Sequence, residues 1–425
     1  MKKNIKKIIS VIATTIAVST MLVGCGGSGE NASSKGENTI TYSIWDKIQE
    51  PGMRAIADAF EEKNPGIKVN VEVTPWDQYW TKLEAAASGG SLPDVFWMHA
   101  KEFTKYAKGN ALLDLTEEIK GDVDLSKYPE GLVELYSLDN KNYAVPKDFD
   151  TVGLWYNKTL FDQAGVSYPD ETWTWDTLLE ASKKLTNKEA GVYGFGAPLN
   201  EHEGYYDFIY QNGGEVLIDN KTKSGYHMPE TVEAMQWYVD LSLKEEVSPK
   251  QDQFAENSPA ALFQSGKIAM GLFGSWMTAE FASNEYTAEN CDVAVLPKGK
   301  ERASIYNGLG NSVSASSKNK DAAVKFVEFL GSEEAQKIQA DKGSAISAYE
   351  GTADTWINAA PKFNLQAYID MLDYSKIKPY TTHAETAKWE KLQNDILKRA
   401  FAGEISVTDA CAQLAAEVDK VLNEK

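Results

Sequence analysis

Hydrophobic and polar positions follow two different periods along the first part of the folded chain. Residues 39–44 and 94–98 are short apolar runs, and residues 67–73 alternate strictly between apolar and polar side chains, so all three predict β-strands. Residues 53–60 and 75–90 instead place apolar side chains at helical spacing. This β-α-β-α-β order predicts an α/β sheet with helices on its faces.

The patterns continue downstream without an internal repeat. Apolar stripes predict helices over residues 175–185, 323–330 and 389–396, and residues 216–226 predict a β-hairpin. Ser406 stands at capping-box distance from Asp409 and predicts the start of a last helix, whose apolar stripe includes Cys411. No segment after Cys25 is long and apolar enough to predict a membrane span.

In sheets of this kind, ligands bind beyond the carboxyl ends of the strands. Three predicted strand ends carry suitable side chains: Trp45 and Asp46 follow the first strand, Trp76 follows the second, and His99 ends the third. Each place offers an aromatic plane, a hydrogen-bonding group, or both. We therefore expect these four residues to contact a ligand.

The N-terminus has the three parts of an export signal. Four lysines precede residues 8–24, which contain no charged residue, and small residues lead up to Cys25. Residues 22–25 resemble a bacterial lipobox, so residues 1–24 are predicted to be a lipoprotein signal peptide and Cys25 the lipid attachment site. Residues 25–37 then form a Gly/Ser-rich tether. The alternatives are an ordinary signal peptide that contains a cysteine, or an uncleaved anchor.

Composition excludes some partners. The chain has a formal net charge of −19, and removal of residues 1–24 would take away four lysines and no acid. Such a protein repels nucleic acid, and we expect most of its acids on solvated helix faces. Cys291 and Cys411 stand far apart and provide neither a disulfide framework nor metal-ligand spacing. We expect no metal and no cofactor.

Four stretches, residues 89–116, 143–165, 261–277 and 308–330, resemble the extracellular solute-binding proteins that serve ATP-driven carbohydrate importers. The likeness is to the maltose-binding type and covers essentially the whole mature chain. It implies a periplasmic-binding-protein-like fold of two α/β lobes, with a hinge and a ligand cleft between them. It further implies lipid anchoring at the outer face of the membrane and a membrane-embedded ABC permease as partner.

Carried over to this numbering, the resemblance implies a first lobe of residues 38–148 plus 305–345. The second lobe would comprise residues 149–304 plus 346–425. The chain would cross the hinge near Lys147–Asp148, near Tyr306 and near Ser344.

Sugar recognition accounts for the candidate side chains. Aromatic rings stack on the apolar faces of a sugar, and carboxylates and amides bind its hydroxyl groups. The chain has eleven tryptophans, and core packing is the alternative for each; it is the preferred reading for Trp155, Trp173 and Trp237. Besides the strand-end residues, the expected ligand-binding residues are Asp148 and Asp150 at the first crossover, Tyr205 or Tyr206 in a loop, Trp276 in the Gly-Ser-Trp loop, Asn307 at the second crossover, and Trp389.

Two other classes of function stay open. One is a surface-anchored enzyme acting on polysaccharide, which needs two facing carboxylates. The sequence has no G-x-S-x-G, H-E-x-x-H or complete P-loop motif, and residues 219–225 lack the alternating acids of a calcium loop. The other is the same fold binding a polyamine, glycerol phosphate or another small polar solute. Binding of a mono- or oligosaccharide, without catalysis, is the preferred interpretation.

Overall fold

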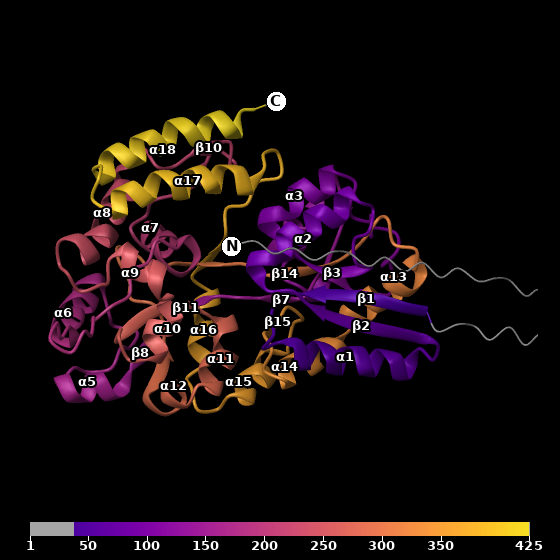
Figure 1. Ribbon diagram of the computed structural model, residues 1–425, viewed down its shortest axis with the longest axis horizontal. Coiled ribbons are helices and arrows are strands. Elements are labelled where there is room, and N and C mark those ends of the chain that lie inside the picture. Colours follow the sequence, from indigo (N-terminus) through magenta and orange to yellow (C-terminus); the bar gives the residue numbers. More distant parts are fainter. Residues whose placement is uncertain (1–37, 425) are drawn as a thin grey trace, which may run out of the picture. The chain divides into compact units, whose positions relative to one another are not determined.

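The computed structural model describes residues 38–424. Its larger sheet has the order β2-β1-β3-β14-β6 and lies on the right of Figure 1. The strands β1, β2 and β3 are parallel, whereas β14 is antiparallel to both β3 and β6. The strand bounds are β1 (Asn38–Ile44), β2 (Ile67–Val73), β3 (Val95–His99), β6 (Val145–Pro146) and β14 (Leu309–Val313).

Helices cover both faces of this sheet, and together with it they form what we call the first lobe. In Figure 1, α1 and α14 lie below the sheet, and α2 and α3 lie above it. The apolar stripe expected at residues 53–60 is the buried face of α1. The helix bounds are α1 (Glu50–Lys63), α2 (Trp76–Ser88), α3 (Ala100–Lys108), α4 (Glu130–Leu135), α13 (Lys320–Leu330) and α14 (Glu333–Asp341).

The second lobe is built around a smaller sheet with the order β11-β8-β12. Both outer strands are antiparallel to β8, whose six residues are all buried. The strand bounds are β8 (Val152–Asn157), β11 (Met270–Gly274) and β12 (Cys291–Ala294). The main helices of this lobe are α5 (Lys158–Ala164), α6 (Trp175–Leu185), α7 (Tyr206–Gln211), α8 (Pro229–Leu243), α11 (Thr278–Ser283), α16 (Gln366–Leu372), α17 (Thr386–Phe401) and α18 (Val407–Leu422).

Antiparallel segments run between the two sheets. β7 (Asp148–Phe149) pairs with β15 (Ile346–Ser347), and Asp150 forms a backbone bridge with Asn307. In Figure 1, β7 and β15 lie between the two lobes. β13 (Ser304–Tyr306), which leads into the second of these segments, pairs in parallel with β16 (Ser375–Ile377). These segments are the hinge of the two-lobe fold.

The remaining elements are short and complete the two lobes. They are η1 (Leu125–Lys127), β4 (Ser137–Leu138), β5 (Lys141–Asn142), η2 (Glu201–Tyr205), β9 (Leu217–Ile218), β10 (Lys223–Ser224), α9 (Gln251–Glu256), α10 (Pro259–Gln264), η3 (Ser275–Met277), α12 (Glu285–Asn290) and α15 (Ala353–Ala359).

The secondary-structure predictions that rest on a regular sequence pattern are confirmed. The β-α-β-α-β order is present as β1 to β3, and the hairpin is present as β9 and β10. The hydroxyl of Ser406 accepts a hydrogen bond from the backbone N–H of Asp409 at 3.0 Å and caps α18. Cys411 lies fully buried on the inner face of that helix, as its apolar stripe predicted.

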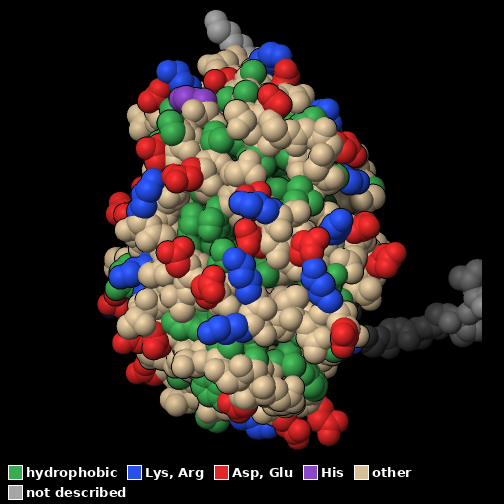
Figure 2. Space-filling model, turned by 90° about the vertical axis from the view of Figure 1, so that its left-hand side faces the viewer, with side chains coloured by type: hydrophobic (Ala, Val, Ile, Leu, Met, Phe, Trp, Pro, Cys, Tyr) green, Lys and Arg blue, Asp and Glu red, His purple; other side chains and the backbone are tan. Residues whose placement is uncertain are grey.

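Charged side chains lie on the surface, and the two described cysteines lie in the core. Acidic and basic side chains intermingle over the face of the second lobe seen in Figure 2. Cys291 and Cys411 are buried free thiols, and burial raises the pKa of each to about 12. Within residues 38–424, no helix has both the length and the apolar character needed to cross a membrane. Cys25 and the predicted signal and tether lie outside the described residues.

Candidate functional site

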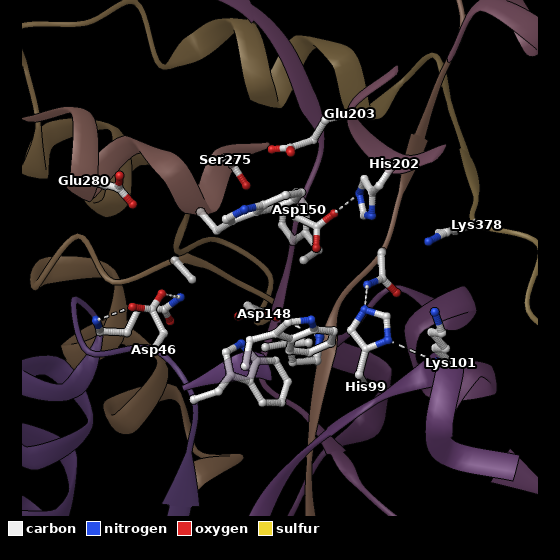
Figure 3. A pocket seen from close by; sticks show the side chains of 18 of the residues that line it. Asp46, His99, Lys101, Asp148, Asp150, His202, Glu203, Ser275, Glu280 and Lys378 are labelled. Carbon is white, nitrogen blue, oxygen red and sulfur yellow. Dashed lines mark hydrogen bonds and ion pairs between the residues drawn. The ribbon is translucent and has the colours of Figure 1, made fainter. Parts of the chain in front are cut away.

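A cavity of about 560 Å³ lies beside the hinge, and both lobes contribute to its lining. From the first lobe come the carboxyl ends of β1 and β3 and the start of α2. From the second lobe come the loop before α7 and the turn after β11. Figure 3 shows the side chains of the two lobes facing one another across this cavity. Its volume is in the range of small-molecule sites.

The first-lobe wall is aromatic. Trp45 follows β1, and its ring makes edge-to-face contacts with Trp76, Tyr79 and Trp97 at centroid distances of 5.0–5.1 Å. Trp76 is the first residue of α2 and remains 42% exposed. Because Trp45 is held by rings on several sides, it presents a rigid apolar surface with little rotamer freedom to lose on binding.

His99 ends β3 and connects the aromatic wall to the hinge. Its Nδ1 accepts a hydrogen bond from the backbone N–H of Lys101 at 3.1 Å and so caps α3. Its Nε2 lies 3.3 Å from the side-chain amide of Asn307. Burial lowers the pKa of His99 well below its usual value, and the nearby Lys378 acts in the same direction. The neutral ring therefore carries its proton on Nε2, which faces the hinge.

The hinge supplies two carboxylates with different surroundings. The side chain of Asp148 accepts hydrogen bonds from Lys147 Nζ at 2.6 Å and from the backbone N–H of Leu309 at 2.8 Å. Burial raises its pKa, although Lys147 opposes this effect. Asp150 Oδ1 lies 2.9 Å from His202 Nε2. Asp148 therefore braces the hinge, whereas Asp150 lies at the boundary with the second lobe.

The second-lobe wall begins with an irregular turn, η2. The side chain of Asn200 accepts hydrogen bonds from the backbone N–H groups of His202 and Glu203 at 2.9 and 3.0 Å. Glu203 accepts a hydrogen bond from the backbone N–H of Gly274 at 2.9 Å. Burial raises the pKa of Glu203 to about 7, although the bond from Gly274 opposes this shift.

Trp276 lies in η3, directly after β11, and its ring folds back over Gly274. A Cβ atom on Gly274 would meet that ring at 2.0 Å, so only glycine fits beneath it. The ring of His202 contacts Trp276 edge-on, with centroids 5.0 Å apart. The Gly-Ser-Trp loop thus places one aromatic plane on the second-lobe wall.

An ion-pair cluster lies at one end of the cavity. Lys378 Nζ lies 3.2 Å from Glu201 and 3.6 Å from Glu390, and Lys101 Nζ lies 2.9 Å from the other oxygen of Glu390. Burial opposes ionisation of Glu201, but Lys378, Lys101 and a backbone hydrogen bond together outweigh it and lower the pKa of Glu201 to about 2. Burial likewise lowers the pKa of Lys378, but Glu390, Tyr380 and Glu201 together outweigh it and raise that pKa well above its usual value. The pair between Lys101 in α3 and Glu390 in α17 joins the two lobes.

The structure brings most of the sequence-predicted site residues to one cavity. Their contact with a ligand stays a prediction. The predicted residues that line the cavity are Trp45, Asp46, Trp76, His99, Asp148, Asp150, Trp276 and Asn307.

Three expected residues lie elsewhere, and the structure corrects their assignment. Tyr205, Tyr206 and Trp389 are fully buried. The first two bond through their hydroxyls to Gln393 of α17, at 2.6 and 2.9 Å. Because α7 begins at Tyr206, both tyrosines turn into the core, and residues 201–203 occupy the cavity side of the loop. Trp389 lies on the buried inner face of α17.

Several lining residues carry no sequence expectation, among them Glu201, His202, Glu203 and Lys378. They stand in an irregular turn and after a three-residue strand, where no hydrophobic period marks the inward positions. The only local signal is Asn200, a residue type that caps turns and helices. Within the described part of the chain, no group of three or more His, Cys, Asp or Glu side chains is arranged to hold a metal ion.

Two lobes, a hinge and a cavity lined from both lobes define a two-lobe ligand-binding protein. The family model for bacterial extracellular solute-binding proteins matches residues 46–337, and the chain belongs to that family. Its members are binding proteins.

Known relatives share the fold over most of their length. An ABC substrate-binding protein from Listeria monocytogenes, solved in complex with cycloalternan, is 30% identical with a TM-score of 0.84, over 92% of this chain and 100% of that one. A Thermotoga lettingae solute-binding protein with bound alpha-D-tagatose is 26% identical with a TM-score of 0.79, over 91% and 100%. The galactooligosaccharide-binding protein of Bacillus subtilis is 26% identical, over 81% of each chain.

Proposed function

We propose that this protein binds a carbohydrate outside the cytoplasm and delivers it to an ABC importer. The observation that carries the proposal is the cavity beside the hinge, where Trp45 and Trp76 lie on one wall and Trp276 lies on the other. Aromatic faces on both walls suit the two apolar faces of a pyranose ring. The relatives described above are named for, or were solved with, carbohydrates, which supports the same ligand class here.

Hydrogen-bonding groups surround these aromatic faces. Asp150, Glu203 and Asn307 line the cavity. Carboxylate and amide groups bind neighbouring sugar hydroxyls, and hydrogen bonds to an ionised group are the stronger kind. A solute that leaves these groups unpaired binds more weakly, so the site favours a ligand with hydroxyl groups.

The ligand stabilises the closed arrangement because it contacts both lobes. We propose lobe boundaries at residues 38–148 plus 305–345 for the first lobe and 149–304 plus 346–425 for the second. The segments that run between the sheets support this division. Small-angle scattering should give a smaller radius of gyration with sugar than without.

The binding proposal is tested by thermal-shift screening of the purified mature domain against sugars, polyamines and phosphates. A sugar should give the largest rise in melting temperature, and product analysis after incubation should recover it unchanged. A larger rise in melting temperature with a polyamine or with glycerol phosphate would show that the ligand belongs to that class and is not a sugar. Conversion of the sugar by stoichiometric protein within hours would favour a polysaccharide-active enzyme instead.

We further propose that residues 1–24 are a lipoprotein signal peptide and that lipid on Cys25 anchors the protein to the outer face of the membrane. More than one acyl chain gives stable anchoring, and residues 26–37 would tether the folded part. Delivery of the solute then requires membrane-embedded permease subunits as partners. Radiolabelled palmitate should mark the wild type and not Cys25→Ser; equal labelling of both would contradict the anchor.

A further inference from the structure

Charged side chains line the cavity unequally. Three ammonium groups and no guanidinium group contribute to the described lining, against six carboxylates. The lysines are Lys47, Lys101 and Lys378, and the acids are Asp46, Asp148, Asp150, Glu201, Glu203 and Glu280.

Each of these lysines already has an acidic partner. Lys378 lies between Glu201 and Glu390, at 3.2 and 3.6 Å, and Lys101 lies 2.9 Å from Glu390. Lys47 is paired with Glu50 of its own lobe. An anionic ligand that used one of these ammonium groups would therefore have to share it with a protein carboxylate.

Besides Glu203, whose hydrogen-bond donors are Gly274 and Asn200, two of the acids have only neutral partners. Asp46 accepts hydrogen bonds from the backbone N–H of Ile48 at 2.7 Å and from the side-chain amide of Gln49 at 2.9 Å. Glu280 accepts one from the side-chain amide of Gln264 at 2.5 Å. Figure 3 shows Asp46 and Glu280 on opposite walls, at the end of the cavity away from Lys378. Amide donors orient these carboxylates and do not neutralise them.

We propose that the site selects an uncharged carbohydrate and rejects carboxylated or phosphorylated forms of the same sugar, with Asp46 and Glu280 as specificity-determining residues. This inference rests on the proposed function and deepens it. A buried anion is bound well when a cation or a set of charge-assisted donors meets it. Here a ligand anion meets the paired Lys101 and Lys378 at one end of the cavity, and at the other end it meets carboxylates whose hydrogen-bond partners are neutral.

The test uses matched sugars that differ in charge alone. Glucose, galactose and maltotriose are each compared with the form that carries a uronic acid and with the form that carries a 2-amino group, by titration calorimetry. For the set whose neutral member binds, the carboxylated form should bind at least about tenfold more weakly, whereas the amino form should bind within a few-fold of the neutral one.

The outcomes separate this inference from the proposed function. If no neutral sugar in these sets or in the wider screen binds, the proposed function fails and the inference fails with it. If the neutral and carboxylated forms bind alike, only the charge selection is overturned. Equal losses of affinity for the amino and carboxylated forms would show that size and not charge excludes them. That result would also overturn the charge selection.

A pair of variants tests the assigned residues. The affinity gap is the ratio between the affinities for the neutral and the carboxylated sugar. Glu280→Gln should narrow this gap several-fold while the neutral sugar still binds. Glu84→Gln makes the same charge change on the outer part of α2, where Glu84 pairs with Lys105 and does not line the cavity, and should leave the gap as in the wild type. Equal gaps in the wild type and Glu280→Gln would remove this residue from the proposal.

Ionic strength gives a readout that needs no variant. Raising the salt from about 0.01 M to about 0.5 M should narrow the wild-type gap, because salt screens charges at the partly open end of the cavity. If Glu280→Gln does not fold, this measurement decides alone. A gap that stays constant across that range would overturn the electrostatic selection.

Discussion

The two walls of the cavity are held in place by different physics. On the first-lobe wall, Trp45 is packed among neighbouring aromatic rings at the ends of regular strands. On the second-lobe wall, His202 and Glu203 stand in an irregular turn and are positioned by hydrogen bonds to Asp150, Asn200 and Gly274. The first wall owes its shape to apolar burial, which is not directional, and the second to polar pairs, which are.

This difference predicts how each wall responds to a single substitution. Loss of one ring from a packed aromatic cluster leaves the neighbouring rings in contact. Loss of one member of a buried polar cluster instead leaves its partner without compensation, and that penalty exceeds the strength of the bond itself. The second-lobe side of the cavity should therefore respond more strongly to single substitutions.

The largest effect is expected for Lys378→Met. Lys378 is 3% exposed and lies between Glu201 and Glu390, so its removal leaves Glu201 without its ion-pair partner. Breaking a buried ion pair in this way typically costs about 3–5 kcal/mol. Denaturant unfolding should show a loss of that order in the free energy of unfolding.

The matched control for that variant is Lys376→Met. Lys376 pairs with Glu215 at the surface, where ion pairs contribute below about 1 kcal/mol. A similar loss of stability in both variants would show that the cluster at the end of the cavity contributes no more than an exposed pair. The contrast between the two walls would then not hold.

The next effect is on binding. Trp276→Ala removes the aromatic plane of the second-lobe wall, and truncation of a central aromatic anchor typically costs about 2 kcal/mol or more, which is roughly thirtyfold in affinity. The melting temperature without ligand should change little, because the ring of Trp276 lies over Gly274 at the cavity and not in the core. Calorimetry with the sugar found by screening measures the loss, and Trp276→Phe should retain most of the affinity. Wild-type affinity in Trp276→Ala would remove this residue from the site.

The site residues that the sequence did predict mostly lie at the ends of regular strands. Trp45, Trp76 and His99 each follow or end a strand whose hydrophobic pattern is visible, so their position at one sheet edge follows from the fold class. Asn307 and Asp150 were reached through the family resemblance, which places the crossovers.

The site residues that the sequence did not predict lie on or beside irregular backbone. The choice between Tyr205 and residues 201–203 depends on a turn whose Gly204 departs from helical geometry, and no period in the sequence reports that. Lys378 follows a three-residue strand, and its neighbour Glu390 is a polar residue on the inner face of α17. A buried acid on an otherwise apolar stripe becomes interpretable only when its partners from other elements are known.

A smaller loss is expected from Trp76→Ala on the first-lobe wall. Trp76 is 42% exposed, and Trp45, Trp80 and His99 remain in place when it is removed. A partly exposed ring contributes about 1 kcal/mol, or roughly fivefold in affinity. Calorimetry beside Trp276→Ala sharpens the comparison, with Trp76→Tyr as the control that keeps a ring. A loss from Trp76→Ala as large as that from Trp276→Ala would show that the two walls hold the ligand equally.

The smallest effect concerns the pH dependence of stability, through Glu203. Burial raises the pKa of Glu203 from 4.5 to about 7, so between these values the native protein holds a proton that the unfolded chain releases. The free energy of unfolding therefore falls as the pH rises through this window. Burial raises the pKa of Asp207 to about 7 as well, so Glu203→Gln removes only the Glu203 share of the decline.

The choice of pH range makes this prediction decisive. Glu201 has a pKa of about 2, and it stabilises the native state above pH 4.5 and loses that effect as the pH falls. Melting temperatures taken between about pH 5 and pH 7.5 exclude that opposite slope. Across this range the melting temperature of Glu203→Gln should fall less than that of the wild type, and Asp207→Asn should show the same sign of change. If wild type and Glu203→Gln lose stability in parallel, Glu203 is ionised in the native protein at pH 5, and the second-lobe wall holds one more uncompensated charge than its hydrogen bonds indicate.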